Sequence, residues 1–159
     1  MFDLKTFTLI HVIISLLALV AGLALLFAWR GGKAQPGLAT ATLVLLLATS
    51  ITGFMFPFIK FLPSHAFGIL SLILLAGTLV ARWSQRLAGH WLTVYGATLA
   101  IAVYLDAFVA LVQALQKIPA LNALAPSDKS PGFMITQGLL LVVFVLLGRS
   151  AVRGLRGSA

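Results

Sequence analysis

The chain has 159 residues, of which 61% are hydrophobic and only 9% are charged, and its mean hydropathy is +1.11. Because roughly one-quarter of the residues in soluble domains are charged, this composition excludes a soluble globular protein and indicates an all-α integral membrane protein with the lipid bilayer as its solvent. The absence of cysteine excludes disulfides and thiolate sites, and the net charge of +8 lies in short connections between apolar runs, so no nucleic-acid partner is expected.

Five apolar segments are long enough to cross the hydrocarbon core, which takes about 20 residues per helix. The pattern predicts transmembrane helices over residues 8–29, 38–58, 66–83, 91–115 and 133–147, in a single transmembrane helical domain spanning residues 1–159. The first segment is predicted to be a retained helix rather than a secretory signal. Its apolar stretch exceeds the roughly 7 to 15 residues of a signal core, and Arg30 follows it.

The connection between the second and third segments is short. It covers residues 59–65, with Pro57 just before it and Pro63 within it. Because proline ends or kinks a helix, four transmembrane helices plus a re-entrant segment are an alternative to five. The longest connection, residues 117–132, contains three prolines and is expected to cover the outer face of the bundle.

The basic residues predict the orientation. With five helices, connections 30–37 and 82–90 and the C-terminal tail share one side, which holds seven cations, including all six arginines, and no acid. Cytoplasmic connections are enriched in Lys and Arg, so we expect the N-terminus out and the C-terminus in, in the bacterial inner (plasma) membrane. Trp29, Trp83 and Trp91 fall at the cytoplasmic ends and are predicted to anchor the helices in the headgroup region.

Polar side chains within the apolar segments are the best indication of function, because lipid offers them no partner. Helix faces on three segments carry them, and those on the first and fourth segments are predicted to point into the bundle. On the first segment the face consists of His11, Ser15, Ala18 and Gly22. On the second segment the face consists of Thr42, Thr49, Gly53 and Lys60. On the fourth it consists of Tyr95, Thr98, Ala102, Asp106, Ala110 and Gln113.

Asp106 is the deepest of these groups and the main functional candidate. It lies about ten residues from the outer end of its segment, roughly 15 Å deep. An ionised carboxylate there costs at least about 2.5 kcal/mol, so Asp106 is expected to be protonated, paired or hydrated. The structural alternative is a protonated carboxyl that donates to a neighbouring carbonyl or glutamine.

Five further polar residues gather in the outer half of the predicted bundle, namely His11, Lys60, His65, Gln113 and Gln137. With Asp106 they are predicted to line a water-accessible pocket, open to the periplasm, that binds a ligand or an ion. Each has a structural alternative as well. The histidines and glutamines can form interhelical or interfacial hydrogen bonds, and the lysine can extend to the headgroup region.

No motif indicates catalysis. The sequence has no Gly-rich phosphate loop, nucleophile elbow, paired carboxylates or metal-ligand spacing, so no catalytic residue and no metal site is predicted, and an enzyme is not expected. Haem is the one cofactor hypothesis. His11 and His65 could hold it only near the outer surface.

Three stretches accompany His11 and its small-residue face: Thr49 to Phe58 (TSITGFMFPF), Tyr104 to Val109 (YLDAFV) and Ala125 to Phe133 (APSDKSPGF). In these features the chain resembles a family of small multi-pass bacterial membrane proteins that contain a domain of unknown function. The resemblance covers nearly the whole chain and implies a topology but no activity. It also implies that Asn is usual at the position of Asp106, which favours a hydrogen-bonding group over a charge.

Three hypotheses of function follow. The first is a small inner-membrane protein that binds or passes a proton, ion or small ligand through the outer-facing polar pocket. The second is a non-catalytic accessory or structural subunit whose polar faces contact a membrane-protein partner or a second copy of the chain. The third is a haem- or quinone-binding redox protein, which would carry a chromophore or a bound quinone.

Overall fold

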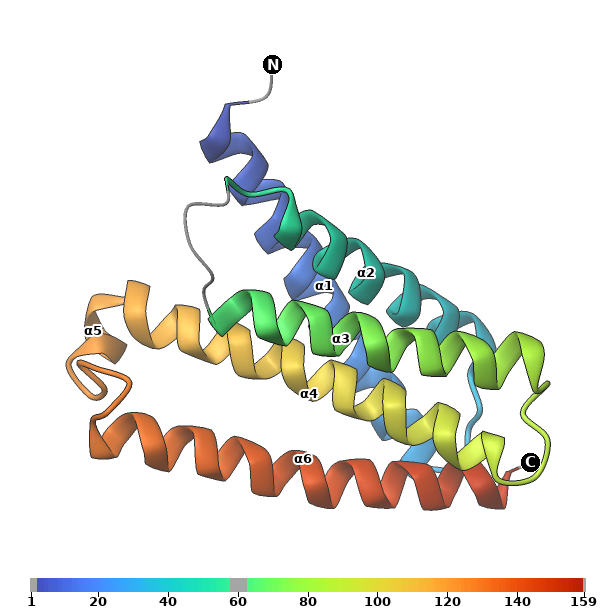
Figure 1. The fold of residues 1–159 in the computed structure, drawn as a ribbon. Coiled ribbons are helices and arrows are strands. Elements are labelled where there is room, and N and C mark those ends of the chain that lie inside the picture. The colour runs from blue at the N-terminus through green and yellow to red at the C-terminus, as the bar shows by residue number, and fades with distance from the viewer. Residues whose placement is uncertain (1–2, 58–62, 159) are drawn as a thin grey trace.

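The computed structural model describes residues 3–57 and 63–158, which form helices joined by short connections (Figure 1). The helices are α1 (Leu4–Arg30), α2 (Pro36–Phe54), α3 (Pro63–Leu79), the π-helix η1 (Val80–Ser84) that continues α3, α4 (Trp91–Lys117), the short α5 (Pro119–Asn122) and α6 (Pro131–Gly157). No strand occurs within these ranges, so the predicted all-α fold is confirmed.

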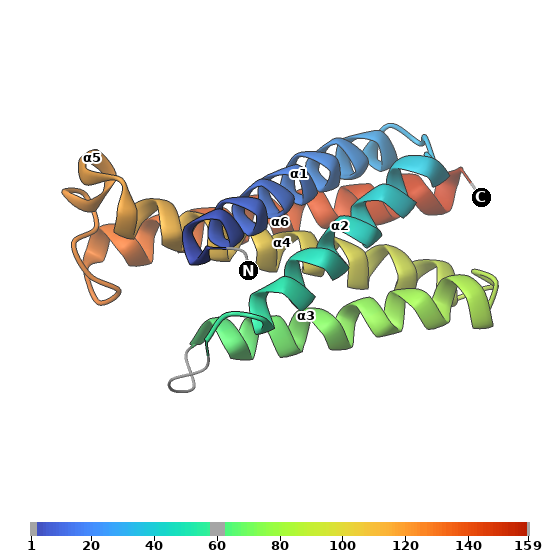
Figure 2. The ribbon, with the colours of Figure 1, turned by 90° about the horizontal axis from the view of Figure 1, so that it is seen from above.

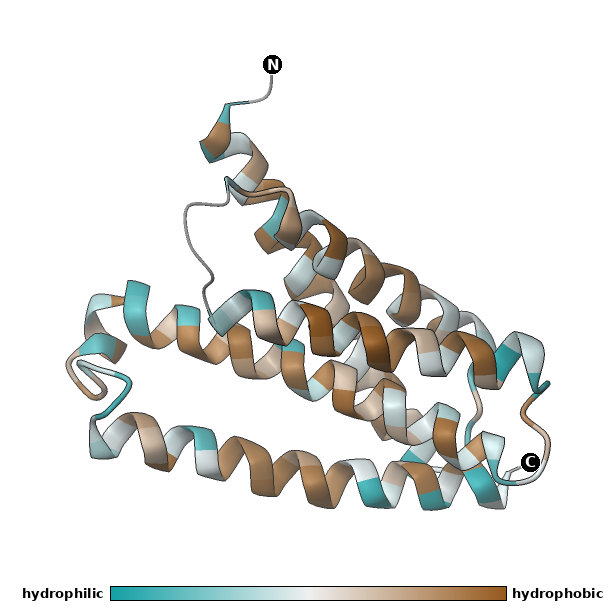
Figure 3. Cartoon of the chain, viewed as in Figure 1, coloured by the Kyte–Doolittle hydropathy of each residue, from teal (hydrophilic) through white to brown (hydrophobic). Residues whose placement is uncertain are grey.

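Five helices are long and apolar enough to cross a membrane, namely α1, α2, α3 with η1, α4 and α6. They present large apolar side chains outward, and Leu9, Ile73 and Leu139 are each exposed by 60% or more. Lipid, unlike water, accommodates such a surface. Figure 3 shows apolar residues along the middle of the helices and polar residues toward their ends. The chain is therefore a transmembrane helical bundle with five candidate spans.

The second predicted helix begins two residues too late and ends four residues too late. α2 begins at Pro36, where the missing N–H costs no hydrogen bond, and it ends at Phe54 rather than at residue 58. Pro57 follows, and its ring disfavours helical conformation in the residue before it. Residues 58–62 lie outside the described part of the chain.

The fifth predicted helix begins two residues too late and ends ten residues too early. α6 begins behind Ser130, whose hydroxyl accepts a hydrogen bond from the Phe133 N–H at 3.3 Å, and it continues to Gly157 rather than ending at residue 147. Arginines 149, 153 and 156 therefore lie on the helix and not in a tail. Arginine is a good helix former, and its long side chain can extend to the headgroup region, so positive charge does not end the helix.

α4 is the central helix of the bundle. It packs against α1, α2, α3 and α6, and α1 also packs against α2 and α6 (Figures 1 and 2). In the described part of the chain α3 and α6 do not contact each other, because they lie on different sides of α4. α4 therefore contains more of the buried residues than any other helix, including Asp106.

Six arginines lie at or near one end of the bundle, at positions 30, 82, 86, 149, 153 and 156, and we call it the arginine-rich end. The C-termini of α1 and α6 and the start of α4 are there. Trp29 is also there, but its indole is fully buried and donates to the Ala34 carbonyl at 2.8 Å. The predicted interfacial role is therefore wrong for Trp29, while Trp83 is 58% exposed.

Most of the buried core lies in the half of the bundle nearest the arginine-rich end, comprising residues 18–46, 75–107 and 144–157, which we call the packed half. Two glycines allow this close packing. A Cβ on Gly154 would collide with the Trp29 carbonyl oxygen, and one on Gly22 would lie 2.6 Å from Val103 Cγ2. Small residues at such crossings let helix backbones approach closely, which favours association in lipid.

The other half, which we call the splayed half, comprises residues 4–17, 47–57, 63–74 and 108–143. Here the N-terminal part of α1 and the C-terminal part of α2 stay together and tilt away from α4 and α6 (Figure 1). The side chains of α1 in this half contact the C-terminal end of α2 and the turn after it: His11 Nδ1 is 2.7 Å from Thr52 Oγ1, and the Phe7 and Phe56 ring centroids are 4.9 Å apart.

Candidate functional site

Asp106 lies on α4 at the boundary between the packed and splayed halves and is only 9% exposed. Its Oδ1 accepts a hydrogen bond from Ser15 Oγ on α1 at 2.8 Å. Its Oδ2 is buried and has no hydrogen-bond partner among the described residues. Asp106 is eleven residues before the end of α4 at Lys117, which places it roughly 16 Å from that end. The predicted burial of the carboxyl group is confirmed.

The contact between Ser15 and Asp106 depends on the packing below it. Ala18 and Gly22 continue the Ser15 face of α1 toward the arginine-rich end, and both are buried. Because Gly22 lacks a side chain, α1 can lie directly against Val103 of α4. Ser15 lies on the same face of α1, and its hydroxyl therefore reaches the Asp106 carboxyl group, one turn beyond Val103 on α4. The predicted inward orientation of this small, polar face is confirmed.

His11 lies one turn beyond Ser15 and bonds to a different helix. Its Nδ1 is 2.7 Å from Thr52 Oγ1 on α2, and the ring packs edge-on against Phe56 at a centroid distance of 5.2 Å. The Thr52 hydroxyl donates to the Ala48 carbonyl at 2.7 Å. Since that hydroxyl has one proton, it accepts from His11, which assigns the ring proton to Nδ1. Nε2 is then the acceptor nitrogen of the neutral ring.

Gln137 on α6 is 8% exposed, and neither its Nε2 nor its Oε1 has a hydrogen-bond partner among the described residues. The register of α4 and α6 locates it, because the Phe144 and Tyr104 rings lie 5.7 Å apart and Gly148 faces Ala100. Since the two helices are antiparallel, Gln137 lies about 7 Å beyond Asp106 along the bundle. An amide with no partner is costly in this environment, and neither of the two described cavities reaches Gln137.

Gln113 does not join these residues. Its side chain is exposed, although the sequence predicted it on the same inward face as Asp106. The difference follows from the tilt of α1, which covers α4 at Asp106 through Ser15 but has turned toward α2 two helical turns later. The predicted position of Gln113 in the polar pocket is therefore wrong.

His65 is half-buried at the start of α3, where its ring lies 6.2 Å from that of Phe54. His11 contacts Thr52 and lies 3.7 Å from the Cβ position of Gly53, on another face of α2. The two imidazoles are thus separated by α2, and this arrangement does not place them on one haem iron. Lys60, the other candidate at this boundary, lies outside the described residues.

Within residues 3–57 and 63–158, no three His, Asp or Glu side chains gather closely enough to hold a metal ion. The polar groups instead form two interhelical pairs, Ser15 with Asp106 and His11 with Thr52, together with Gln137. This arrangement can take up and release a proton on a carboxyl or an imidazole. It can also donate and accept hydrogen bonds to a small ligand.

Sequence reasoning counted Arg82 only as a topological charge, but the structure gives it a defined environment. Its Nη2 donates to Thr40 Oγ1 at 2.7 Å, its Nη1 is buried without a partner among the described residues, and its guanidinium lies 5.0 Å from the Trp83 ring centroid. A cavity of about 200 Å³ beside it is also lined by Tyr95. The only signal in the sequence is an arginine in the last turn of a predicted span.

Comparison with known proteins finds no protein-family model, no curated protein and no solved structure that matches this chain. The arrangement of the polar side chains is therefore the evidence for the function of this protein.

Proposed function

We propose that this chain is a small multi-pass protein of the bacterial inner (plasma) membrane that binds or passes a proton at Asp106, with access from the end opposite the arginines. One observation carries the proposal: a nearly buried carboxyl in a membrane span has one oxygen bonded to Ser15 and the other without a partner. A proton on Oδ2 removes the charge, which would otherwise cost at least about 2.5 kcal/mol in lipid.

Three further groups support access from the splayed half. His11, Thr52 and Gln137 all lie between Asp106 and the end of the bundle opposite the arginines. His11 and Ser15 are four residues apart on α1, so their side chains are neighbours on one face. The Asp106 carboxyl group thus has polar neighbours on the side away from the arginines. On the other side, the packed half is mainly apolar.

The distribution of positive charge indicates how the protein is oriented in the membrane. The arginine-rich end faces the cytoplasm, because cytoplasmic segments are enriched in Lys and Arg, and the splayed half then faces the periplasm. Because the chain has no cysteine, single cysteines at Ser158 and Ser127 report this directly. In intact cells a membrane-impermeant maleimide should label Ser127→Cys and not Ser158→Cys. The reverse pattern would place the proton site on the cytoplasmic side.

The protonation state of Asp106 can be tested with a hydrophobic carbodiimide, which reacts with a protonated carboxyl in lipid. The wild-type protein should carry one adduct on the α4 peptide containing Asp106, detected by mass spectrometry, and labelling should fall as pH rises because the carboxylate does not react. Asp106→Asn is the matched control and should not be labelled. A wild-type protein that stays unlabelled at every pH would refute a proton site at Asp106.

Proton transfer is tested separately in liposomes containing a pH-sensitive dye. If the protein passes protons, an imposed potential should drive a flux that Asp106→Asn abolishes and Ser15→Ala reduces. A protein that is labelled at Asp106 but gives no flux binds a proton without conducting it. Co-purification of a stoichiometric membrane partner, with no change on Asp106→Asn, would favour the accessory-subunit hypothesis instead.

A further inference from the structure

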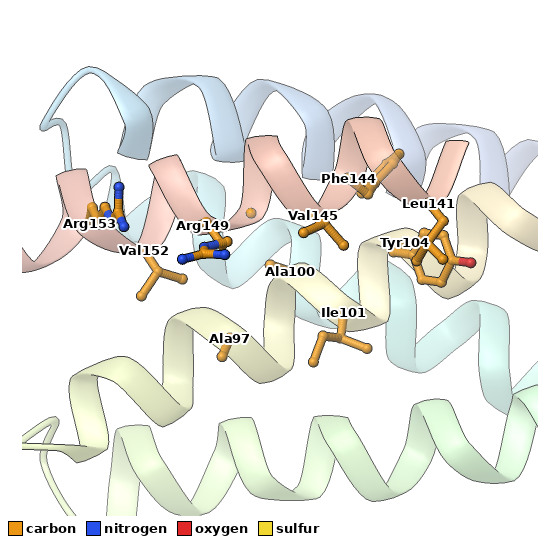
Figure 4. Close-up of a pocket in the computed structure, with 11 residues that line it drawn as sticks. Ala97, Ala100, Ile101, Tyr104, Leu141, Phe144, Val145, Arg149, Val152 and Arg153 are labelled. Carbon is orange, nitrogen blue, oxygen red and sulfur yellow. The ribbon is translucent and has the colours of Figure 1, made fainter. Parts of the chain in front are cut away.

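The larger of the two described cavities is a groove of about 510 Å³ between α4 and α6, and Asp106 does not line it. Figure 4 shows the residues that line it, with two arginines toward one end and a tyrosine toward the other. Those used below are Ala97, Ile101, Tyr104, Val145, Arg149 and Arg153. Between the arginines and the tyrosine the surface is almost entirely apolar. We call it the α4/α6 groove.

The α4/α6 groove faces lipid. Ile101 is 45% exposed and Val145 is 46% exposed, and both line it. No helix in the described part of the chain covers this side, because α6 packs only against α1 and α4. In the membrane the groove is therefore in contact with acyl chains, and its occupant comes from the bilayer.

The length of the groove matches one leaflet. Its α6 wall extends from Leu141 to Arg153, and twelve residues of helix span about 18 Å. Half of the hydrocarbon core of a bilayer is about 15 Å. With the arginines near the headgroup region, a single acyl chain can lie along the groove toward Tyr104.

The two arginines form no ion pair with an acidic side chain among the described residues. Arg149 and Arg153 are one turn apart on α6 and both are exposed. The chain has only three acids, Asp3, Asp106 and Asp128, and none of them lies at the arginine-rich end. Guanidinium groups form paired hydrogen bonds with phosphate, so an anionic headgroup supplies the missing charge at the depth of these side chains.

We propose that the α4/α6 groove is a binding site for one anionic phospholipid of the leaflet at the arginine-rich end. The phosphate lies between Arg149 and Arg153, and one acyl chain lies along Ala97, Ile101 and Val145. Basic pockets between transmembrane helices on the cytoplasmic side bind anionic headgroups in this way. The site is independent of the proton site at Asp106.

Native mass spectrometry of the protein in nanodiscs of equal phosphatidylglycerol and phosphatidylcholine tests the headgroup. The wild-type protein should retain phosphatidylglycerol in preference to phosphatidylcholine. The double variant Arg149→Gln and Arg153→Gln should lose about tenfold in retained phosphatidylglycerol, as a factor of ten corresponds to about 1.4 kcal/mol. Arg156→Gln is the matched control, because Arg156 is an exposed arginine of the same helix that does not line the groove.

A second variant tests the acyl-chain part while keeping both arginines. Ala97→Leu places a larger side chain in the groove and should lower phosphatidylglycerol retention, with circular dichroism confirming that the helices are intact. A photoreactive acyl chain should label peptides containing Ile101 or Val145 in the wild type only. Equal retention of the two lipids, or unchanged retention in the arginine double variant, would overturn the proposal. So would a dimer that Ala97→Leu dissociates, because a second copy would then occupy the groove.

Discussion

The packed and splayed halves of this bundle contain the same kinds of helix but use their side chains differently. In the packed half, glycine and alanine let α1 approach α4 and α6, and leucines fill the spaces between them. In the splayed half, α1 and α2 leave the other helices, and the side chains of His11 and Thr52 form a hydrogen bond between them. Hydrogen bonds between helices also occur in the packed half, from Arg82 to Thr40 and between Thr78 and Thr98. Asp106 lies where one arrangement changes into the other.

The packed half is expected to stabilise the fold, and the splayed half is expected to affect proton binding. A closely packed half provides dispersion contacts over a large area, and these are the main source of association between helices in lipid. A hydrogen bond between membrane helices contributes little to the free energy of unfolding, on average about 0.6 kcal/mol. We therefore expect substitutions in the packed half to lower stability, and substitutions in the splayed half to change proton binding while the fold is retained.

The largest effect is expected at the crossing of α1 and α6. Gly154→Ala puts a methyl group against the Trp29 carbonyl and should destabilise the protein by on the order of 3 kcal/mol, as overpacking does. Gly138→Ala is the matched control on the same helix, because its Cβ position is open, and it should be neutral or stabilising by up to about 1 kcal/mol. Thermal unfolding in detergent measures both. Equal unfolding temperatures would mean that the α1 and α6 backbones are not in close contact.

The next effect is expected at Trp29. Trp29→Phe removes the hydrogen bond to the Ala34 carbonyl and leaves space in a fully buried site, so a loss of about 2 kcal/mol is expected. Trp83→Phe changes an exposed indole at the same end of the bundle and should cost about 0.5 kcal/mol, mainly through the weaker contact with the Arg82 guanidinium. If the two variants unfold at the same temperature, Trp29 is an interfacial residue after all.

A smaller effect is expected for the pair that joins the two halves. A double-mutant cycle of Ser15→Ala and Asp106→Leu should give a coupling energy of about 0.6 to 1.7 kcal/mol, because each variant removes one partner of the hydrogen bond that the two side chains share. Unfolding in detergent provides the four free energies. Ser15→Ala should also change the pH at which the carbodiimide stops labelling Asp106, whereas a coupling energy near zero would mean that the pair does not form.

The smallest effect on stability is expected in the splayed half. Thr52→Val keeps the size of the side chain but removes the acceptor of the His11 hydrogen bond, and it should lower stability by about 0.6 kcal/mol. Thr40→Val removes the partner of Arg82 in the packed half and should cost more, since that donor is charged. The comparison sharpens the distinction between the halves. If Thr52→Val lowered the free energy of unfolding as much as Thr40→Val or more, the splayed half would contribute to stability at least as much as the packed half.

The sequence by itself determined the membrane class, the five spans and the inward position of Asp106. These properties depend on local composition and on helical spacing, because lipid requires long apolar segments and penalises an exposed carboxyl. It also predicted that the face of α1 from His11 to Gly22 contacts other helices, since small and polar residues at this spacing have that use in membranes. The predicted ends of the second and fifth helices differ from those of α2 and α6, because proline follows α2 and arginines continue α6.

The tertiary structure alone decided which helix each polar group contacts. Ser15 and His11 share one face of α1, yet the first bonds to α4 and the second to α2 because α1 changes neighbours between them. The same tilt leaves Gln113 exposed, and α2 keeps His65 apart from His11. Periodicity fixes the direction of a side chain relative to its own helix, but its partner depends on helix crossing angles, which arise from the packing of many small residues at once.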